Sequence, residues 1–161
     1  MNNQTRYIFL DIESGGVNIE NTILTIALVV TDSEFEVLAK EHWAVCPDDG
    51  NFIVTSEGLA KNRLDLVKLG EVAQPYKVIK RDLVTFIKTW SDDGKNKLIP
   101  VGYGIVFDLQ HIYHHLITVE TWNQYCSYRS LDIRSVIQFL DRKSTRLNSS
   151  HVSESRMPSS A

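Results

Sequence analysis

Ten residues near the N-terminus, YIFLDIESGG from Tyr7 to Gly16, constrain the fold more than any other stretch of the sequence. The apolar run that ends at Leu10 predicts a short strand buried on both faces. Asp11 and Glu13 follow it, and their carboxylates project to the same side, roughly 7 Å apart at Cα, because side chains alternate along a strand. Paired carboxylates beside a core need positive charge, and Mg²⁺ takes oxygen ligands. The stretch therefore predicts a cation site, the alternative being a polar turn with two solvated acids.

The composition is that of one globular domain with a sizeable core. The chain has 161 residues, of which 43% are hydrophobic and 23% are charged. No apolar run reaches the length of a membrane span, and the start, MNNQTR, lacks a signal-peptide pattern, which predicts a cytoplasmic location. Cys46 and Cys126 are too far apart to suggest a disulfide framework or a zinc site. The net charge of −3 gives no general attraction to nucleic acid, so such a partner needs a local basic strip or bound metal ions.

The order of elements predicts an α/β fold. An antiparallel meander of three strands comes first, the acidic strand leading, followed by helices around one further strand. The later strands are expected at 22–31, 34–44 and 98–103. Helices are expected at 57–62, 75–90, 107–117, 121–125 and 130–140, with Thr55 or Ser56 and Asp132 as N-caps. Residues 64–73 fit neither pattern.

The last 21 residues, from Asp141 onward, differ in composition from the rest: seven are Ser and the apolar residues show no period. This composition predicts a disordered tail. Residues 141–151 also resemble the translation of a common sequencing-library adapter, and residues 155–158 resemble the adapter's other half in the same frame. We therefore expect residues 141–161 to be non-native, and the biological reading frame to be cut short near Leu140.

A second cluster, VGYGIVFDLQHIYHHL, covers Val101 to Leu116. Here a strand ends in two glycines and Asp108 opens a helix, where an Asp is most often only an N-cap. Together with the two strand acids, it becomes a third carboxylate at the mouth of a sheet, where α/β folds bind their ligands. On the same helix, His111 and His115 have the spacing of metal ligands, although histidines on an ordinary helix surface are the favoured interpretation.

At these residues the sequence resembles the DEDD superfamily of 3′-to-5′ exonucleases, DnaQ-like proteins with a ribonuclease H-like fold. The first motif of the family, D-x-E with a small residue and Gly following, is matched by Asp11, Glu13, Ser14 and Gly15. The second, a strand ending in Gly and then Phe-Asp before a helix, is matched by Gly102, Phe107 and Asp108. Residues 56–66 and 128–140 resemble the segments before the second and third motifs. The resemblance thus covers about residues 6–140, with Tyr103 and Gly104 departing from the usual His-Asn.

The resemblance implies a mixed sheet of about five strands with flanking helices, and a site for two Mg²⁺ or Mn²⁺ ions. Asp11, Glu13 and Asp108 would be the metal ligands and catalytic residues. Ser14, Gly15 and Gly16 would contact the nucleotide at a single-stranded 3′ end of DNA or RNA. No membrane partner is implied, and the oligomeric state is left open.

The third motif, a His or Tyr general base with a fourth Asp a few residues later, is not found in the sequence. Residues 1–140 are therefore expected to form an incomplete exonuclease domain, and the chain as written is expected to be close to inactive, since loss of a general base typically costs roughly 10²–10⁴-fold in rate. Two alternatives stay open: a non-catalytic nucleic-acid-binding or structural domain on the same fold, and an endonuclease of the ribonuclease H type. Lys77, Lys80, Arg81 and Lys88 could meet phosphates, although a solvated helix face is the simpler interpretation.

Overall fold

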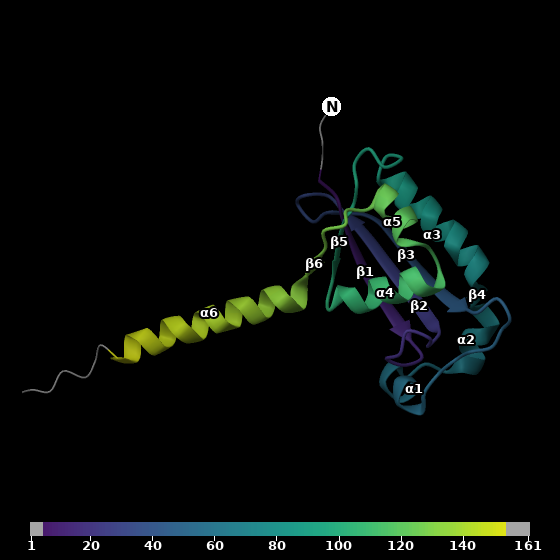
Figure 1. Ribbon diagram of the computed structural model, residues 1–161, viewed down its shortest axis with the longest axis horizontal. Coiled ribbons are helices and arrows are strands. Elements are labelled where there is room, and N and C mark those ends of the chain that lie inside the picture. The colour runs from purple at the N-terminus through teal and green to yellow at the C-terminus, as the bar shows by residue number, and fades with distance from the viewer. Residues whose placement is uncertain (1–4, 154–161) are drawn as a thin grey trace, which may run out of the picture.

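The computed structural model describes residues 5–153, with side chains described as far as residue 143. Its core is a six-stranded mixed sheet in the order β4-β3-β2-β1-β5-β6 (Figure 1). The strands are β1 (Tyr7–Ser14), β2 (Ile23–Thr31), β3 (Val37–Cys46), β4 (Gln74–Pro75), β5 (Ile99–Gly102) and β6 (Leu131–Asp132). β1, β2 and β3 pair antiparallel, whereas β5 pairs parallel with β1. The predicted α/β fold, meander and mixed sheet are confirmed. The two-residue strands β4 and β6 were not predicted, because they are too short to show a sequence pattern.

β1 differs from the prediction in its length and in its burial. It continues through both acids to Ser14, with Ile8, Leu10 and Ile12 buried on one face. The prediction that it is buried on both faces is wrong, because Tyr7 and Phe9 are only half-buried. Their face is covered by Phe35 from the turn between β2 and β3, whose ring stacks on Tyr7 at a centroid distance of 5.3 Å. A single aromatic ring shields these residues less than a packed helix does.

The helices are α1 (Ser56–Asn62), α2 (Leu66–Val72), α3 (Tyr76–Trp90), α4 (Ile105–His115), α5 (Val119–Tyr125) and α6 (Ile133–Ser153). Thr55 caps α1, as predicted, by accepting the Gly58 N–H. The ambiguous segment forms α2, whose N-cap Asp65 accepts two backbone N–H groups. α3 buries Ile79, Leu83 and Ile87, which are spaced by four residues and so share one face. These side chains join the strand residues in the main hydrophobic core.

α6 extends away from the sheet at the C-terminal end of the domain (Figure 1). Asp132 caps it as predicted, since its Oδ1 accepts the N–H of Arg134 at 3.0 Å. The helix continues past Leu140 as far as Ser153, into the segment whose composition predicts disorder. Residues 154–161 lie outside the described residues. Helical backbone does not bear on the origin of these residues, and the adapter interpretation stays a prediction.

Within residues 5–153, no helix combines the length and the apolar character that a membrane crossing needs.

Candidate carboxylate site

The alternation of β1 places Asp11 and Glu13 on the same face of the sheet, as predicted from their spacing. Asp11 is exposed and Glu13 is half-buried. On the neighbouring strand β2, Ala27 pairs with Asp11 and Thr25 pairs with Glu13. Both acids therefore project from one face of the same strand.

Asp108 reaches β1 from the first turn of α4. The helix begins at Ile105, after Gly104 in the left-handed region with a φ of 75°, so the interpretation of Asp108 as an N-cap is wrong. β5 pairs with β1 only from Tyr7 to Phe9, which leaves the same edge of β1 without a strand neighbour further along. Asp108 occupies that edge, and its Oδ1 accepts the N–H of Ile12 at 3.1 Å. This hydrogen bond joins Asp108, from the second motif, to Ile12, which lies between Asp11 and Glu13 of the first motif.

The three acids, which we call the carboxylate site, influence one another electrostatically. Asp108 is only 5% exposed. Burial, with the charges of Asp11 and Glu13 adding to it, raises the Asp108 pKa to about 6, although the bond from Ile12 opposes this shift. The pKa of Glu13 is also raised, first by burial and then by Asp11, whereas Lys61 on α1 lowers it. The cluster thus holds more negative charge than the protein compensates.

A hard divalent cation fits this donor set, because carboxylate oxygens are its preferred ligands and it would relieve the repulsion among them. The part of the chain that the structure describes nevertheless holds no group of three or more His, Cys, Asp or Glu side chains in a metal-binding arrangement. One carboxylate oxygen of Asp108 accepts the N–H of Ile12. The site has the chemistry for a cation without a preformed coordination shell.

The turn after Glu13 is locked against the segment before α1. Gly15 donates its N–H to the carbonyl of Thr22 at 2.8 Å and accepts the N–H of Thr55 at 2.7 Å. A Cβ added at Gly15 would lie 2.6 Å from the carbonyl oxygen of Ile53, so glycine is required for this approach. Ser14, predicted as a substrate contact, donates its hydroxyl to the carbonyl of Gly16 at 2.6 Å. The substrate roles of Ser14, Gly15 and Gly16 stay predictions.

Three histidines of α4 hold the next part of this turn, residues 18–20. His111 Nε2 lies 3.2 Å from the carbonyl oxygen of Asn18, and His115 Nε2 lies 2.8 Å from that of Ile19. His114 Nε2 lies 3.3 Å from a carboxylate oxygen of Glu20. The interpretation as surface histidines is wrong for His111, which is 1% exposed. These side chains attach the helix that carries Asp108 to the loop that follows Glu13.

Two residues of α1 belong to this region although no sequence pattern assigned them a role in it. Asn62 donates its side-chain N–H to the carbonyl of Ser14 at 2.7 Å. Lys61 is the cation whose charge acts on Glu13. The only sequence signal for them is the resemblance of residues 56–66 to the segment that links the first two motifs of the family.

The chain is similar to proteins named oligoribonuclease. It is 27% identical over 142 residues to the one from Ralstonia nicotianae, a match that covers 84% of this chain and 62% of that protein. It is 26% identical over 159 residues to the one from Pseudomonas syringae pv. syringae, covering 91% and 83%. The chain thus spans less than two thirds of the Ralstonia relative. No protein-family model matches the sequence.

Solved structures of exonuclease I share the fold. Escherichia coli exonuclease I in complex with a dT13 oligonucleotide has a TM-score of 0.67 and 17% identity, covering 83% of this chain and 29% of that one. A product-bound exonuclease I has the same TM-score and 18% identity, covering 83% and 31%. This likeness shows that the chain shares the fold of these structures. The relatives named oligoribonuclease and the shared fold both support the resemblance to the DEDD family of 3′-to-5′ exonucleases.

Proposed function

We propose that the carboxylate site is part of a 3′-to-5′ exonuclease centre that binds Mg²⁺ or Mn²⁺ through Asp11, Glu13 and Asp108. The observation that carries this proposal is the bond from the Ile12 N–H to Asp108, together with the Asp108 pKa of about 6. Carboxyl groups with strongly shifted pKa values that come from distant parts of a chain are typical of functional sites. When bound, such ions polarise a phosphate and make a water nucleophilic near neutral pH.

The substrate we propose is the single-stranded 3′ end of a nucleic acid. Two similarities support it: the relatives are named oligoribonuclease, and E. coli exonuclease I has been solved with a dT13 oligonucleotide. Lys61, beside Glu13, supplies a positive charge that a phosphate could approach in an otherwise acidic region. The choice between DNA and RNA is left to experiment, and the cytoplasmic location stays a prediction.

We further propose that the chain as written hydrolyses slowly, since it shows no third motif with a general base and a fourth Asp. In the proposed reaction, Asp11, Glu13 and Asp108 would hold the ions, and Ser14, Gly15 and Gly16 would contact the 3′-terminal nucleotide. The proton of the attacking water would pass to solvent. The competing proposal is a binding domain that does not cleave. The observation in its favour is that the described residues show no metal-binding arrangement.

The test is a single-turnover assay with excess full-length chain, Mn²⁺, and 5′-labelled DNA and RNA oligonucleotides. We expect slow, stepwise shortening from the 3′ end, which stops with EDTA and in the Asp11→Asn variant. Binding with no shortening would support the non-cleaving domain, and internal cuts would support an endonuclease. Turnover as fast as that of a full-length oligoribonuclease would overturn the proposal of slow hydrolysis. A Glu57→Lys variant, changed on the exposed face of α1, should act as the wild type does.

A further inference from the structure

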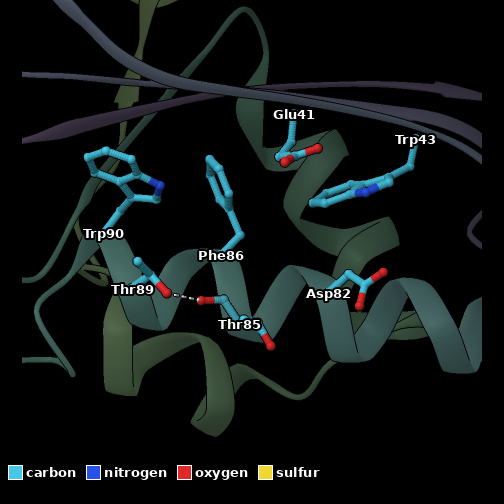
Figure 2. Close-up of a pocket in the computed structure, with 7 residues that line it drawn as sticks. All are labelled: Glu41, Trp43, Asp82, Thr85, Phe86, Thr89 and Trp90. Carbon is cyan, nitrogen blue, oxygen red and sulfur yellow. Dashed lines mark hydrogen bonds between the residues drawn. The ribbon is translucent and has the colours of Figure 1, made fainter.

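A groove of about 320 Å³ lies between β3 and α3. We call it the aromatic groove; its lining residues are Glu41, Trp43, Asp82, Thr85, Phe86, Thr89 and Trp90. Figure 2 shows Glu41 and Trp43 extending from the strand toward the helix, and Phe86 and Trp90 extending from the helix toward the strand. Trp43 and Phe86 meet edge to face at 6.4 Å, and Phe86 lies 6.5 Å from Trp90. Three rings and two carboxylates thus surround one open space.

Within residues 5–153, the strand above this groove has an outer edge that is paired only at its end. β3 spans Val37–Cys46, but β4 pairs with it only at Val45 and Cys46. Most side chains of β3 before Trp43 are exposed. Among the residues that the structure describes, no strand pairs with the outer edge of β3 before Val45. Such an edge is a template for an additional strand from another chain.

The side chains at this edge of β3 determine which kind of segment can pair with it. Glu41 and Trp43 lie on the helix-covered face of β3, because they pair with the buried residues Leu28 and Ile26. A carboxylate beside aromatic faces favours a guanidinium or ammonium group and repels phosphate. Asp82 is already paired with Arg81 at 2.8 Å, so Glu41 is the acid available to a partner. Charges on a strand edge prevent pairing with unrelated chains, and so restrict it to a partner of complementary charge.

We propose that the outer edge of β3 and the aromatic groove form one docking surface for an extended, basic segment of another protein. The segment pairs with β3 as an added strand and places an Arg or Lys side chain beside Glu41, against the rings of Trp43 and Phe86 that line the groove. β2 separates this surface from β1 and its carboxylate site, so the docking proposal does not rest on the proposed nuclease function. A protein segment, rather than a nucleic acid, is the occupant because the available charge is negative.

The experiment titrates the ¹⁵N-labelled full chain with three short peptides and records amide shifts and tryptophan fluorescence. The first peptide alternates Val and Arg, the second has Glu in place of Arg, and the third is the first with alternate backbone nitrogens methylated to block strand pairing. We expect saturable shifts along Val37–Ala44 with the Arg peptide only. The other two should bind at least about tenfold more weakly, because one reverses the charge and the other lacks donors.

Two variants make the test specific to the groove. Glu41→Lys changes an exposed side chain and should weaken the Arg peptide by about tenfold or more through like-charge repulsion. Glu57→Lys makes the same charge change on α1 and should leave binding unchanged. The proposal is overturned if none of the peptides binds, if all three bind alike, if the shifts gather around the carboxylate site, or if Glu41→Lys binds as tightly as the wild type. The test does not require a substitution of the half-buried Trp43, which could disturb folding, because Glu41 is exposed.

Discussion

The carboxylate site and the aromatic groove both lie at a strand edge that lacks a neighbouring strand, and they differ in what fills it. At the carboxylate site, the edge of β1 beyond Phe9 is taken by Asp108 of the same chain, whose Oδ1 accepts the Ile12 N–H. At the groove, the outer edge of β3 before Val45 has no strand partner among the described residues. An edge closed by the chain's own side chain fixes a site in place, whereas an open edge leaves pairing to a second chain.

The acids of the two regions also differ in their burial and in their charged neighbours. Asp108 is buried and its pKa is raised to about 6, in part by Asp11 and Glu13. In the groove, Asp82 has Arg81 as a partner and Glu41 is exposed. Acidity alone therefore does not mark a chemical site. What marks it is a buried acid, Asp108, whose pKa is raised by its burial and by the charges of two further acids.

The largest expected effect is on the tightly packed turn of the carboxylate site. In Gly15→Ala the new Cβ would meet the Ile53 carbonyl at 2.6 Å and Val54 Cγ1 at 2.7 Å. Because one of these contacts is backbone, we expect the free energy of unfolding to fall by about 3 kcal/mol, the upper range for overpacking. Urea denaturation measures it. The control is Gly70→Ala on α2, where no atom lies within 4 Å, and where alanine should stabilise by about 0.5–1 kcal/mol. Equal effects of the two substitutions would contradict the tight packing.

The second prediction concerns added cations. At pH 8, Mn²⁺ or Mg²⁺ at a hundred times its dissociation constant should raise the free energy of unfolding by about 2.7 kcal/mol through linkage. The gain should be largely lost in Asp11→Asn, and it should persist in Glu41→Gln, which alters the groove. Thermal denaturation with and without EDTA measures the gain. An unchanged gain in Asp11→Asn would show that the ions bind elsewhere.

The third prediction concerns the pH dependence of the metal-free protein. The Asp108 pKa is raised from 3.8 to about 6. Its contribution to stability is therefore fully present below pH 4 and is lost as the pH rises through 6. Asp108→Asn keeps an oxygen for the Ile12 N–H and does not ionise. Relative to wild type, it should gain up to about 3 kcal/mol between pH 4 and pH 7, at 1.36 kcal/mol per pKa unit. Denaturant titrations across this range measure the gain, and a difference that does not change with pH would contradict the shift.

The sequence predicted the elements that carry a clear local pattern. Apolar and β-branched runs predicted the first strands of the meander, helical spacing predicted α3, and the caps Thr55 and Asp132 came from local preferences. The second face of β1 was predicted to be buried but is only half-buried. The ring of Phe35 covers it from a turn, and that turn carries no periodic signal in the sequence. β4 and β6 were not predicted, since strands of two residues have no pattern to detect.

For the carboxylate site, the sequence named three acids as a prediction but not how they are held. The spacing of Asp11 and Glu13 and the family resemblance named the three acids. The sequence did not show that Asp108 lies inside the first turn of α4 and bonds to Ile12, because this depends on where β5 stops pairing with β1. Lys61 and the three histidines were missed as neighbours for the same reason, since their contacts join segments far apart in the chain.

The smallest expected effect concerns His115, which attaches α4 to the turn next to the carboxylate site. Burial, the largest cause, lowers the pKa of His115. Because the unfolded chain then binds a proton more readily, stability falls as the pH drops below about 6.5, the ordinary histidine value. In His115→Gln, whose amide N–H can also donate to Ile19, this loss is removed. The free energy of unfolding should therefore change less between pH 7 and pH 5.

His42→Gln makes the same substitution at an exposed position of β3 and is the matched control. Both variants retain the contact between His114 and Glu20, so this contact is common to the two slopes. A slope in His115→Gln equal to that of His42→Gln would contradict the lowered pKa of His115, and with it the burial of this side chain against the turn that follows Glu13.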